Sequence, residues 1–419
     1  MLTFQTPLDL VRVLRPEQPV ALVRPERVSV AAGWFQENFP GEVLFAVKAN
    51  PSLWALDAMY EAGQRWFDVA SIDEVELIAK RYHDATLAFM HPVKSRAAIA
   101  RAYFEFGVRI FVLDCEAELD KILEATKFAE DLTLMVRMAV PNGSASLPLT
   151  GKFGCKPDAA PSLLQAVRLH ADEMGVSFHV GSQCMDPGAY RIAIETVSDA
   201  IRQAAVTIDI VDVGGGFPVN YPGMTPPDWQ SYVDVIVDAF ENMPVLYNAD
   251  LWCEPGRALV ADSTSILAKV ELVKDSEVHI NDGAYGNLFD AVHCAWKFPI
   301  RVHRADGETS DESKGFKVYG PTCDSIDTLD GQLELPADLA EGDYVEFGML
   351  GSYGVAMSTR FNGFGDTLTV KVDDQIGRSM TPEADVVELG DNVILFPFGG
   401  RRASLGSCKL RVTRLRLLS

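Results

Sequence analysis

The stretch that decides the fold is residues 43–90, VLFAVKANPSLWALDAMYEAGQRWFDVASIDEVELIAKRYHDATLAFM. Short apolar runs alternate here with segments that have the periodicity of amphipathic helices. The runs are Val43–Lys48, Trp66–Ala70 and Thr86–Met90. The helical segment Ser71–Tyr82 starts with Ser71 and has Glu74 three residues later, which is a typical helix start. Strands that alternate with helices indicate a parallel sheet.

The same alternation continues to about residue 255, and eight apolar runs can be counted. The remaining runs are Val108–Leu113, Leu132–Met138, Val176–Gly181, Ile208–Val213 and Asp250–Cys253. Further helical segments are expected at Glu116–Ala129 and Ala189–Ala205. A doubly wound open sheet would alternate in the same way. Eight strands over a length near the roughly 250 residues of typical barrels favour a closed (β/α)8 barrel, here residues 25–260.

After about residue 260 strand-like runs dominate and few helical periods appear. These runs are Ser265–Val273, Glu277–Ile280, Gly315–Tyr319, Tyr344–Phe347, Thr367–Val372 and Val393–Phe396. They predict a second, mostly β domain of residues 261–419. Residues 1–24 lie outside the barrel count, and Pro19–Val23 is expected to pair with this second domain.

Composition narrows the class of protein. The net charge of −22 argues against nucleic acid as a partner and is compatible with a cationic substrate, although solubility alone also explains it. No apolar stretch approaches the roughly 20 residues of a membrane helix, and the N-terminus has no signal-peptide pattern. The seven cysteines are scattered without a CxxC pair, so neither a disulfide scaffold nor a metal site is expected. A cytoplasmic protein without a membrane partner is the expectation.

Chemically versatile residues gather where the barrel strands end, which is where barrel enzymes place their active sites. They are Lys48, Asp68, Arg137, His179, Ser182, Gly214, Gly215, Gly216, Glu254, Pro255, Gly256 and Arg257. A desolvated lysine is the nucleophile of Schiff-base chemistry, but Lys48 could also reach out to solvent. The glycines could let backbone N–H groups approach a phosphate or could form a tight turn.

Glu254 and His179 have the properties of groups that hold a pyridine ring. A carboxylate beside the ring nitrogen keeps it protonated, although a salt bridge to Arg257 would explain Glu254 equally well. The flat imidazole of His179 suits stacking, but a core histidine is the commoner case. In the second domain, Cys323 beside Asp324 could donate a proton to carbon or could be an inert cysteine.

Eight motifs, taken in order, carry a resemblance to a known family. They are FAVKANP, FDVAS, HVGSQ, DVGGGFP, CEPGR, NDGAYG, GPTCDSID and STRFNGF, between about residues 40 and 364. In this order they resemble the pyridoxal-phosphate decarboxylases of the alanine-racemase fold (fold type III). Within that group the sequence looks most similar to ornithine/lysine decarboxylases.

The resemblance implies a role for each rim residue. Lys48 would carry pyridoxal 5'-phosphate as a Schiff base, His179 would stack on its ring, and Glu254 would pair with the ring nitrogen. The remaining cofactor contacts would come from Asp68, Arg137, Ser182, Gly214, Gly215, Gly216, Pro255, Gly256, Arg257 and Tyr353. Cys323 would protonate the carbon that loses carboxylate. Asp324 would face the distal amine of the substrate, with Phe361 near it.

The resemblance also implies a homodimer with shared active sites. In such a dimer, Cys323 and Asp324 reach into the site of the partner subunit. A monomer would then be inactive.

One segment departs from the family pattern. Ornithine decarboxylases carry a second acid for the distal amine about a dozen residues after the aspartate of DGxYG. Here that stretch reads LFDAVHCAWKF, with His293 and Cys294 near the expected place and Asp290 four residues early. Gln183 is closer to diaminopimelate decarboxylases, whereas Asp324 is typical of the ornithine enzymes.

The expected activity is decarboxylation of L-ornithine and/or L-lysine to a diamine for polyamine metabolism. The first alternative is a related substrate: diaminopimelate, carboxynorspermidine or arginine. The second is a non-catalytic regulatory homologue, which should have lost Lys48, Cys323 or phosphate ligands. All of these are present.

Overall fold

The computed structural model describes residues 1–149, 151–374, 387–389 and 393–395. In it, eight parallel strands close into a barrel, because the last strand, β12, pairs with the first, β3. In chain order the barrel strands are β3 (Glu42–Ala46), β4 (Trp66–Val69), β5 (Thr86–Phe89), β6 (Ile110–Leu113), β7 (Thr133–Arg137), β9 (Glu173–Ser177), β11 (Ile210–Asp212) and β12 (Asp250–Cys253). The predicted (β/α)8 barrel is therefore confirmed.

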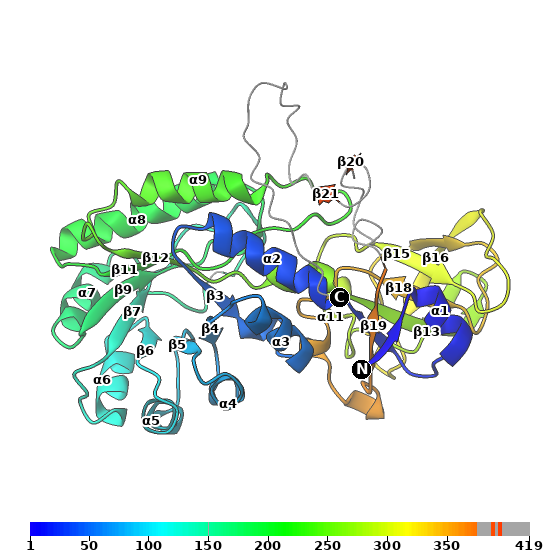
Figure 1. Ribbon diagram of the computed structural model, residues 1–419, viewed down its shortest axis with the longest axis horizontal. Helices are drawn as coiled ribbons and strands as arrows, with labels where there is room; N and C mark the ends of the chain where they lie inside the picture. Colours follow the sequence, from blue (N-terminus) through cyan, green and yellow to red (C-terminus); the bar gives the residue numbers. More distant parts are fainter. Residues whose placement is uncertain (150, 375–386, 390–392, 396–419) are drawn as a thin grey trace. The chain divides into compact units, whose positions relative to one another are not determined.

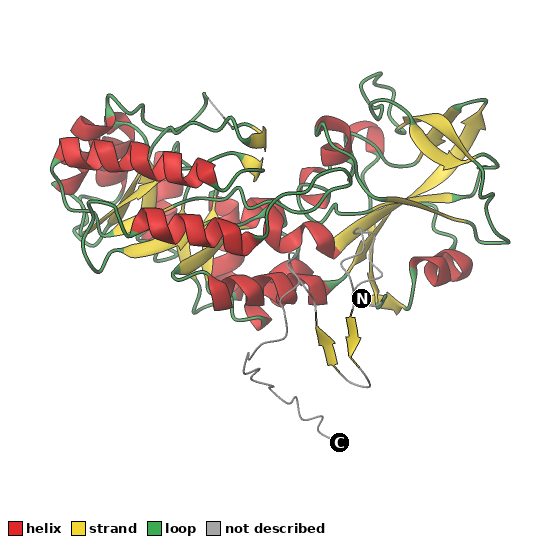
Figure 2. Ribbon diagram, turned by 90° about the horizontal axis from the view of Figure 1, so that it is seen from above, coloured by secondary structure: helices red, strands yellow, loops and turns green. Residues whose placement is uncertain are grey.

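Helices surround the barrel on its outside (Figures 1 and 2). They are α2 (Pro25–Asn38), α3 (Leu53–Glu61), α4 (Ile72–Arg81), α5 (Arg96–Phe104), α6 (Glu116–Ala125), α7 (Ala160–Arg168), α8 (Gly188–Ala204) and α9 (Trp229–Phe240). Helix α4 begins as its sequence predicts, since the hydroxyl of Ser71 accepts a hydrogen bond from the backbone N–H of Glu74 (3.2 Å). The carboxylate of Glu74 accepts one in return from the N–H of Ala70 (2.7 Å).

The strands are apolar on both faces, because one face lines the barrel and the other packs against helices. Leu44 lies in the small cluster of the barrel interior, whereas its neighbours Val43 and Phe45 belong to the larger core beneath the helices. This double burial is why each strand reads as a continuous apolar run rather than as an alternation.

The sixth barrel strand lies earlier than the sequence predicts. The expected run was Val176–Gly181, but β9 spans Glu173–Ser177. The apolar pattern misses the start of β9 because neither Glu173 nor Gly175 is a large apolar residue. Glycine is needed here, since a Cβ at Gly175 would lie 2.1 Å from the sulfur of Met135, which fills the barrel interior.

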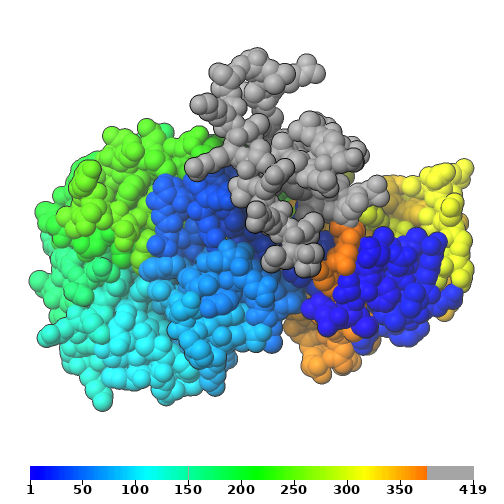
Figure 3. Space-filling view, in the orientation of Figure 1, coloured from blue at the N-terminus to red at the C-terminus, as the bar shows by residue number. Residues whose placement is uncertain are grey.

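The second part of the fold is a nine-stranded sheet. Its strands are β1 (Leu2–Phe4), β2 (Val20–Val23), β13 (Thr264–Lys274), β14 (Glu277–Ile280), β15 (Ile300–His303), β16 (Ser313–Tyr319), β17 (Leu333–Pro336), β18 (Tyr344–Phe347) and β19 (Leu368–Val372). Strand β2 lies between β13, which runs antiparallel to it, and β19, which runs parallel. The N-terminal residues and the segment before residue 372 adjoin on the face shown in Figure 3.

Shorter elements connect these strands. They are α1 (Pro7–Leu14), the 3-10 turn η1 (Val47–Ala49), β8 (Ala145–Leu147), β10 (Ser182–Cys184), α10 (Arg257–Val260), η2 (Ala261–Ser263), α11 (Phe289–His293), η3 (Val355–Met357) and η4 (Phe361–Gly363). Strands β8 and β10 pair with each other beside the barrel.

By compactness, residues 1–382 form one unit and Glu383–Ser419 a second one. The expected domain division near residue 260 falls inside the first unit. In the second unit the structure describes β20 (Val387–Leu389) and β21 (Val393–Leu395), which pair antiparallel. Phe396, the last residue of the expected strand Val393–Phe396, lies outside the described residues, as does most of the tail. No helix in the described ranges is long and apolar enough to cross a membrane.

Candidate active site

Lys48 opens the site, in the 3-10 turn η1 directly after β3. Its Nζ lies 2.6 Å from Oδ2 of Asp68, which is buried in the neighbouring strand β4. The side chain of Lys48 is 44% exposed, whereas that of Asp68 is buried, so the amine is accessible at the barrel mouth.

The charge state of Lys48 differs from the neutral amine that burial suggests. Burial lowers the pKa of the ammonium group, but the carboxylates of Asp68 and Glu254 outweigh it, and the pKa lies above its ordinary value. Lys48 is therefore charged in this structure, and Asp68 is the acceptor beside its protons. Before Lys48 can attack a carbonyl carbon, a proton has to leave its amine.

Asp212 and Glu254 form a buried acidic pair at the ends of β11 and β12. Burial raises both pKa values, that of Asp212 to about 6, and the charge of Asp212 further raises the pKa of Glu254. Oδ1 of Asp212 accepts a hydrogen bond from the N–H of Gly214 (2.8 Å), whereas Oδ2 of Asp212 and Oε1 of Glu254 have no donor. The two carboxyl groups interact directly, so one proton shared between them is the stable arrangement.

Asp212 was not among the residues predicted for the site. It ends the apolar run Ile208–Val213 directly before the triple glycine. An acid at the end of a buried strand was the signal that could have identified it.

His179 follows β9 and stays neutral. Burial lowers the pKa of its imidazole to about 3, and the charges of Arg137 and Lys48 act in the same direction. Nδ1 accepts a hydrogen bond from the N–H of Gly181 (2.9 Å), which assigns the ring proton to Nε2. A Cβ at Gly215 would lie 3.1 Å from Nε2, so glycine keeps the space beside this ring free.

The three glycines after β11 allow a close approach of neighbouring backbone. Gly214 and Gly216 have φ values of 69° and 113°, which favour glycine. A Cβ at Gly214 would lie 2.1 Å from the carbonyl oxygen of Phe178. The three glycines therefore form a tight turn, and this turn is compatible with a phosphate subsite.

Arg257 lies almost fully buried at the start of α10, after Glu254, Pro255 and Gly256. Its Nε donates to Oγ of Ser182 (3.3 Å), and its guanidinium lies 5.0 Å from the ring centre of Tyr353. The backbone N–H of Tyr353 donates to the carbonyl of Ala49 (2.9 Å). A loop of the second part of the fold is thereby held against the barrel rim beside Lys48.

The two residues before Arg257 close the rim. The carbonyl of Pro255 accepts a hydrogen bond from the N–H of Ala46 (3.3 Å). A Cβ at Gly256 would lie 3.1 Å from Cβ of Ala49. Glycine thus lets the last barrel strand approach the turn that carries Lys48.

Asp290, expected near the substrate, has a different partner. Its Oδ2 lies 2.7 Å from Nη1 of Arg257, and both side chains are buried. Its carboxylate is therefore engaged by the guanidinium.

Arg137 ends β7. Beside it lies Phe153, a residue that the sequence patterns did not indicate as part of the site. The guanidinium of Arg137 lies 5.8 Å from the ring centre of Phe153, whose ring also meets that of His91 (5.1 Å). Lys152 lies 4.9 Å from the same ring. An aromatic residue between glycines, in Gly151-Lys-Phe-Gly154, was the available signal.

Cys323, Asp324 and Phe361 gather on the surface of the second part. The N–H of Cys323 donates to Oδ1 of Asn362 (3.1 Å), and the hydroxyl of Tyr285 donates to Oδ2 of Asp324 (2.6 Å). The rings of Tyr285 and Phe361 are 4.7 Å apart. The structure thus brings together three separate sequence motifs, but their contacts are with one another and not with Lys48.

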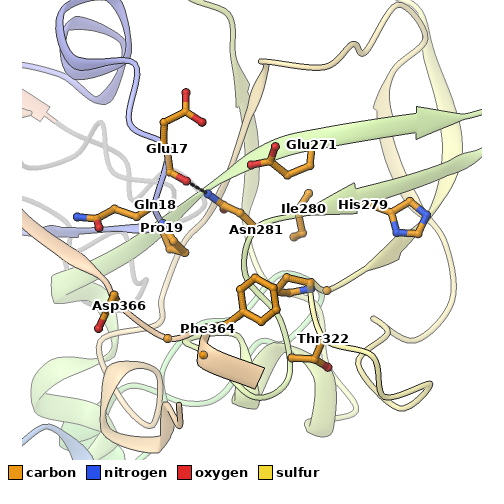
Figure 4. Close-up of a pocket in the computed structure, with 14 residues that line it drawn as sticks. Glu17, Gln18, Pro19, Glu271, His279, Ile280, Asn281, Thr322, Phe364 and Asp366 are labelled. Carbon is orange, nitrogen blue, oxygen red and sulfur yellow. Dashed lines mark hydrogen bonds between the residues drawn. The ribbon is translucent and has the colours of Figure 1, made fainter. Parts of the chain in front are cut away.

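A pocket of about 540 Å³ lies in the same part of the fold (Figure 4). Thr322, Phe364, Ile280 and Asn281 line it, and Nδ2 of Asn281 donates to the carbonyl of Glu17 (3.0 Å). None of the barrel-rim residues named above lines it, so this pocket is distinct from the site around Lys48.

The rim residues fit a flat, phosphorylated pyridine aldehyde. Lys48 offers an accessible amine, His179 offers a neutral ring face, and Oε1 of Glu254 is a buried carboxyl oxygen without a donor. Arg257 and Ser182 offer donors for a phosphate beside glycines that carry no side chains. A barrel with this set of groups defines a pyridoxal-phosphate enzyme.

Comparison with known proteins assigns the family. Residues 26–261 match the family model "Pyridoxal-dependent decarboxylase, pyridoxal binding domain". This match covers more than half of the chain, and the protein belongs to that family. It is a pyridoxal-phosphate-dependent carboxy-lyase.

Among curated relatives, the lysine/ornithine decarboxylase of Selenomonas ruminantium is 30% identical over 80% of this chain and 84% of its own. The ornithine decarboxylase of Caenorhabditis elegans is 31% identical over 79% of this chain and 81% of its own. Among solved structures, the arginine decarboxylase of Paramecium bursaria Chlorella virus bound to agmatine has a TM-score of 0.77 and 26% identity, and the match covers 87% of this chain and 98% of that one.

Proposed function

We propose that the protein decarboxylates L-ornithine and/or L-lysine to the corresponding diamine. The observation that carries this proposal is the arrangement at the barrel rim, where the accessible amine of Lys48 faces Asp68 and lies near Glu254. Support also comes from the relatives named as lysine/ornithine and ornithine decarboxylases. The diamine would serve polyamine metabolism in the cytoplasm, which agrees with cysteines that are free wherever the structure describes them.

In this proposal residues 25–260 form the barrel domain that holds the cofactor, and residues 1–24 with 261–419 form the β-rich domain. Lys48 provides the amine for covalent attachment, and Asp68 accepts and returns its proton. Glu254 faces the ring nitrogen, His179 lies on the ring, and Arg137 lies nearby. The phosphate contacts come from Ser182, Gly214, Gly215, Gly216, Arg257 and Tyr353.

Pyridoxal phosphate, when bound, supplies a ring that accepts the electron pair left by the departing carboxylate. The buried pair of Glu254 and Asp212 holds a proton where the ring nitrogen would lie. The glutamate at this position favours decarboxylation over racemisation, because racemases of this fold place an arginine there. The thiol of Cys323 donates the proton to the substrate carbon, and Asp324 binds the distal amine.

We infer that these last two groups act in the active site of a partner subunit. Cys323 is exposed in the single chain, and Asp324 and Tyr285 lie beside it at the surface. Exposed apolar side chains surround them, namely Ile326, Phe361 and Phe364. Such a patch is typical of a protein interface, so a homodimer with two shared sites is the proposed active form.

One observation favours a second candidate, a related substrate with a different distal group. The segment after the DGxYG motif offers no free carboxylate, because Asp290 is engaged by Arg257 and Cys294 is a buried thiol whose pKa is raised to about 12. Asp324 is then left as the acid for a distal amine. Diaminopimelate, carboxynorspermidine and arginine are the candidates.

A substrate panel tests the proposal. Purified protein with added pyridoxal phosphate is incubated with L-ornithine, L-lysine, L-arginine, meso-diaminopimelate and carboxynorspermidine, and carbon dioxide and amine product are measured. Turnover of ornithine or lysine supports the proposal, and turnover of another member alone supports the second candidate. Lys48→Ala is the negative control and should also lose the near-visible absorption of the attached cofactor, whereas Lys80→Ala, at an exposed lysine, should keep both.

If no substrate is turned over although the cofactor binds, the proposed activity is wrong, and the protein is better described as a non-catalytic homologue.

A further inference from the structure

Arg257 is held from one side by a buried network. Its Nη1 donates to Oδ2 of Asp290 (2.7 Å), to the hydroxyl of Tyr221 (2.9 Å) and to Oγ of Ser352 (3.2 Å). Its Nε donates to Oγ of Ser182 (3.3 Å). Within the part of the chain that the structure describes, Nη2 has no hydrogen-bond partner. The donors on the Ser182 side are therefore the ones left for an incoming anion.

Asp290 supplies the negative charge of this network from α11, and it is 4% exposed. The thiol of Cys294 also bonds to its carboxyl group. Trp296 shields the pair, because the guanidinium of Arg257 lies 5.3 Å from its ring centre. The buried cation and the buried anion cancel, so the arginine presents far less positive charge than an unpaired one would.

We propose that Asp290 is a positioning residue, which fixes the guanidinium of Arg257 for a phosphate monoester and at the same time weakens the binding of that phosphate. This inference rests on the proposed phosphate role of Arg257 and replaces the expected substrate role of Asp290. Two opposing effects follow from one side chain. Its hydrogen bond orders the guanidinium, and its charge repels the phosphate dianion on the other side.

The two effects can be separated by a change that keeps the hydrogen bond and removes the charge. In Asp290→Asn, the amide oxygen still accepts from Nη1, and Arg257 keeps a net positive charge. Asp306→Asn is the control, because it removes one acidic charge from an exposed site that pairs with Arg15. The proteins are stripped of cofactor and titrated with pyridoxal phosphate and, separately, with pyridoxal, and the dissociation constants are read from absorbance.

The expected result is that Asp290→Asn binds pyridoxal phosphate roughly tenfold more tightly, as removal of one like charge near a dianion predicts, with pyridoxal binding unchanged. Inorganic phosphate should raise the melting temperature of the stripped variant more than that of the wild type. If Asp290→Asn does not fold, Asp290→Ser is measured in the same way, because serine also removes the charge and retains an acceptor.

The inference is overturned if the folded variant binds pyridoxal phosphate no more tightly than the wild type, or if pyridoxal binding changes to the same extent. A raised KM for the amino acid with unchanged cofactor binding would instead support the expected role of Asp290 in substrate binding. Failure of the stripped wild type to bind either compound would instead refute the proposed cofactor site itself.

Discussion

Single carboxyl groups carry much of the chemistry at the barrel rim, and Asp212 is one whose ionisation affects the stability of the fold. It is fully buried, and one of its two oxygens has no hydrogen-bond donor. Removing its proton would place a negative charge in a region shielded from water. The pair therefore keeps a proton to a higher pH than isolated carboxyl groups would.

This arrangement gives a defined pH dependence. Because the pKa of Asp212 is raised from 3.8 to about 6 on folding, its proton stabilises the folded state fully below about pH 4. That contribution is lost as the pH rises through about 6. An amide does not ionise, so Asp212→Asn should not lose stability as the pH rises. At pH 7 the cofactor-free variant should therefore be roughly 1–3 kcal/mol more stable than the wild type.

Urea unfolding at several pH values between 4 and 8 measures this effect. Asp234→Asn is the control, since Asp234 is a helix-surface acid paired with Gln230. Unfolding free energies of Asp212→Asn and the wild type that run parallel over this range would contradict the shared proton.

Cys323 allows a second test at the residue scale. Cys323→Ala should retain the cofactor and lose about 10²–10⁴-fold in rate, as is typical when a positioned proton donor is removed. A proton that reaches the wrong carbon leads to an aldehyde in place of the diamine, so the share of aldehyde among the products should rise. Cys115→Ala, a change at another exposed cysteine, should leave rate and products unchanged. Clean diamine formation at the wild-type rate would exclude Cys323 as the donor.

At the scale of elements, the sequence predicts those helices and strands whose buried residues recur at regular spacing. The start of α4 was predictable because Ser71 and Glu74 act locally. The shift of β9 was not, because Gly175 is required by Met135 from another strand. Strands β15 and β17 escaped prediction since parts of them are exposed and their residues do not form a clear apolar run.

The same limit applies to charges that become buried. Lys94 precedes α5, and its Nζ donates to the carbonyls of His91 (2.9 Å) and Val112 (2.6 Å) and lies 3.1 Å from Glu118 of α6. The side chains of Lys94 and Glu118 are 1% and 3% exposed. In sequence both look like ordinary surface residues, yet together they tie α6 to the loop after β5.

Removal of one partner tests this tie. Glu118→Ala should destabilise the protein by about 3–5 kcal/mol, because it leaves a buried ammonium group without its carboxylate. Glu116→Ala, at the exposed start of the same helix, should cost much less. The free energies come from urea unfolding. A similar loss in both variants would mean that the pair contributes little beyond helix propensity.

For the whole molecule, the barrel and the β-rich part were both predictable from the order of apolar runs. The place of Lys48 and Glu254 at one rim was predictable because each follows directly after a barrel strand. The pairing of Asp290 with Arg257 was not, because it joins residues from the two parts of the fold through packing that no local pattern encodes.

The proposed dimer makes a prediction at this scale. Lys48→Ala and Cys323→Ala should each be inactive or nearly so, but a mixture of the two that exchanges subunits should recover about a quarter of wild-type activity. Random exchange makes half of the dimers mixed, and each mixed dimer contains one intact site. Activity is measured after mixing, alongside the mass of the particle by light scattering. A monomeric mass, or no recovery despite exchange, would contradict shared sites.

The position of β2 has a consequence for how the protein is made. Val20–Val23 is flanked by β13 and β19, whose residues follow it by more than 240 and about 350 positions. At about 5–20 residues per second, a ribosome completes β19 roughly 20–70 seconds after β2. Until β13 is made this apolar strand has neither neighbour, and until β19 is made it lacks one of the two. Nascent chains therefore need protection there, and variants that slow translation after residue 260 should yield more insoluble protein.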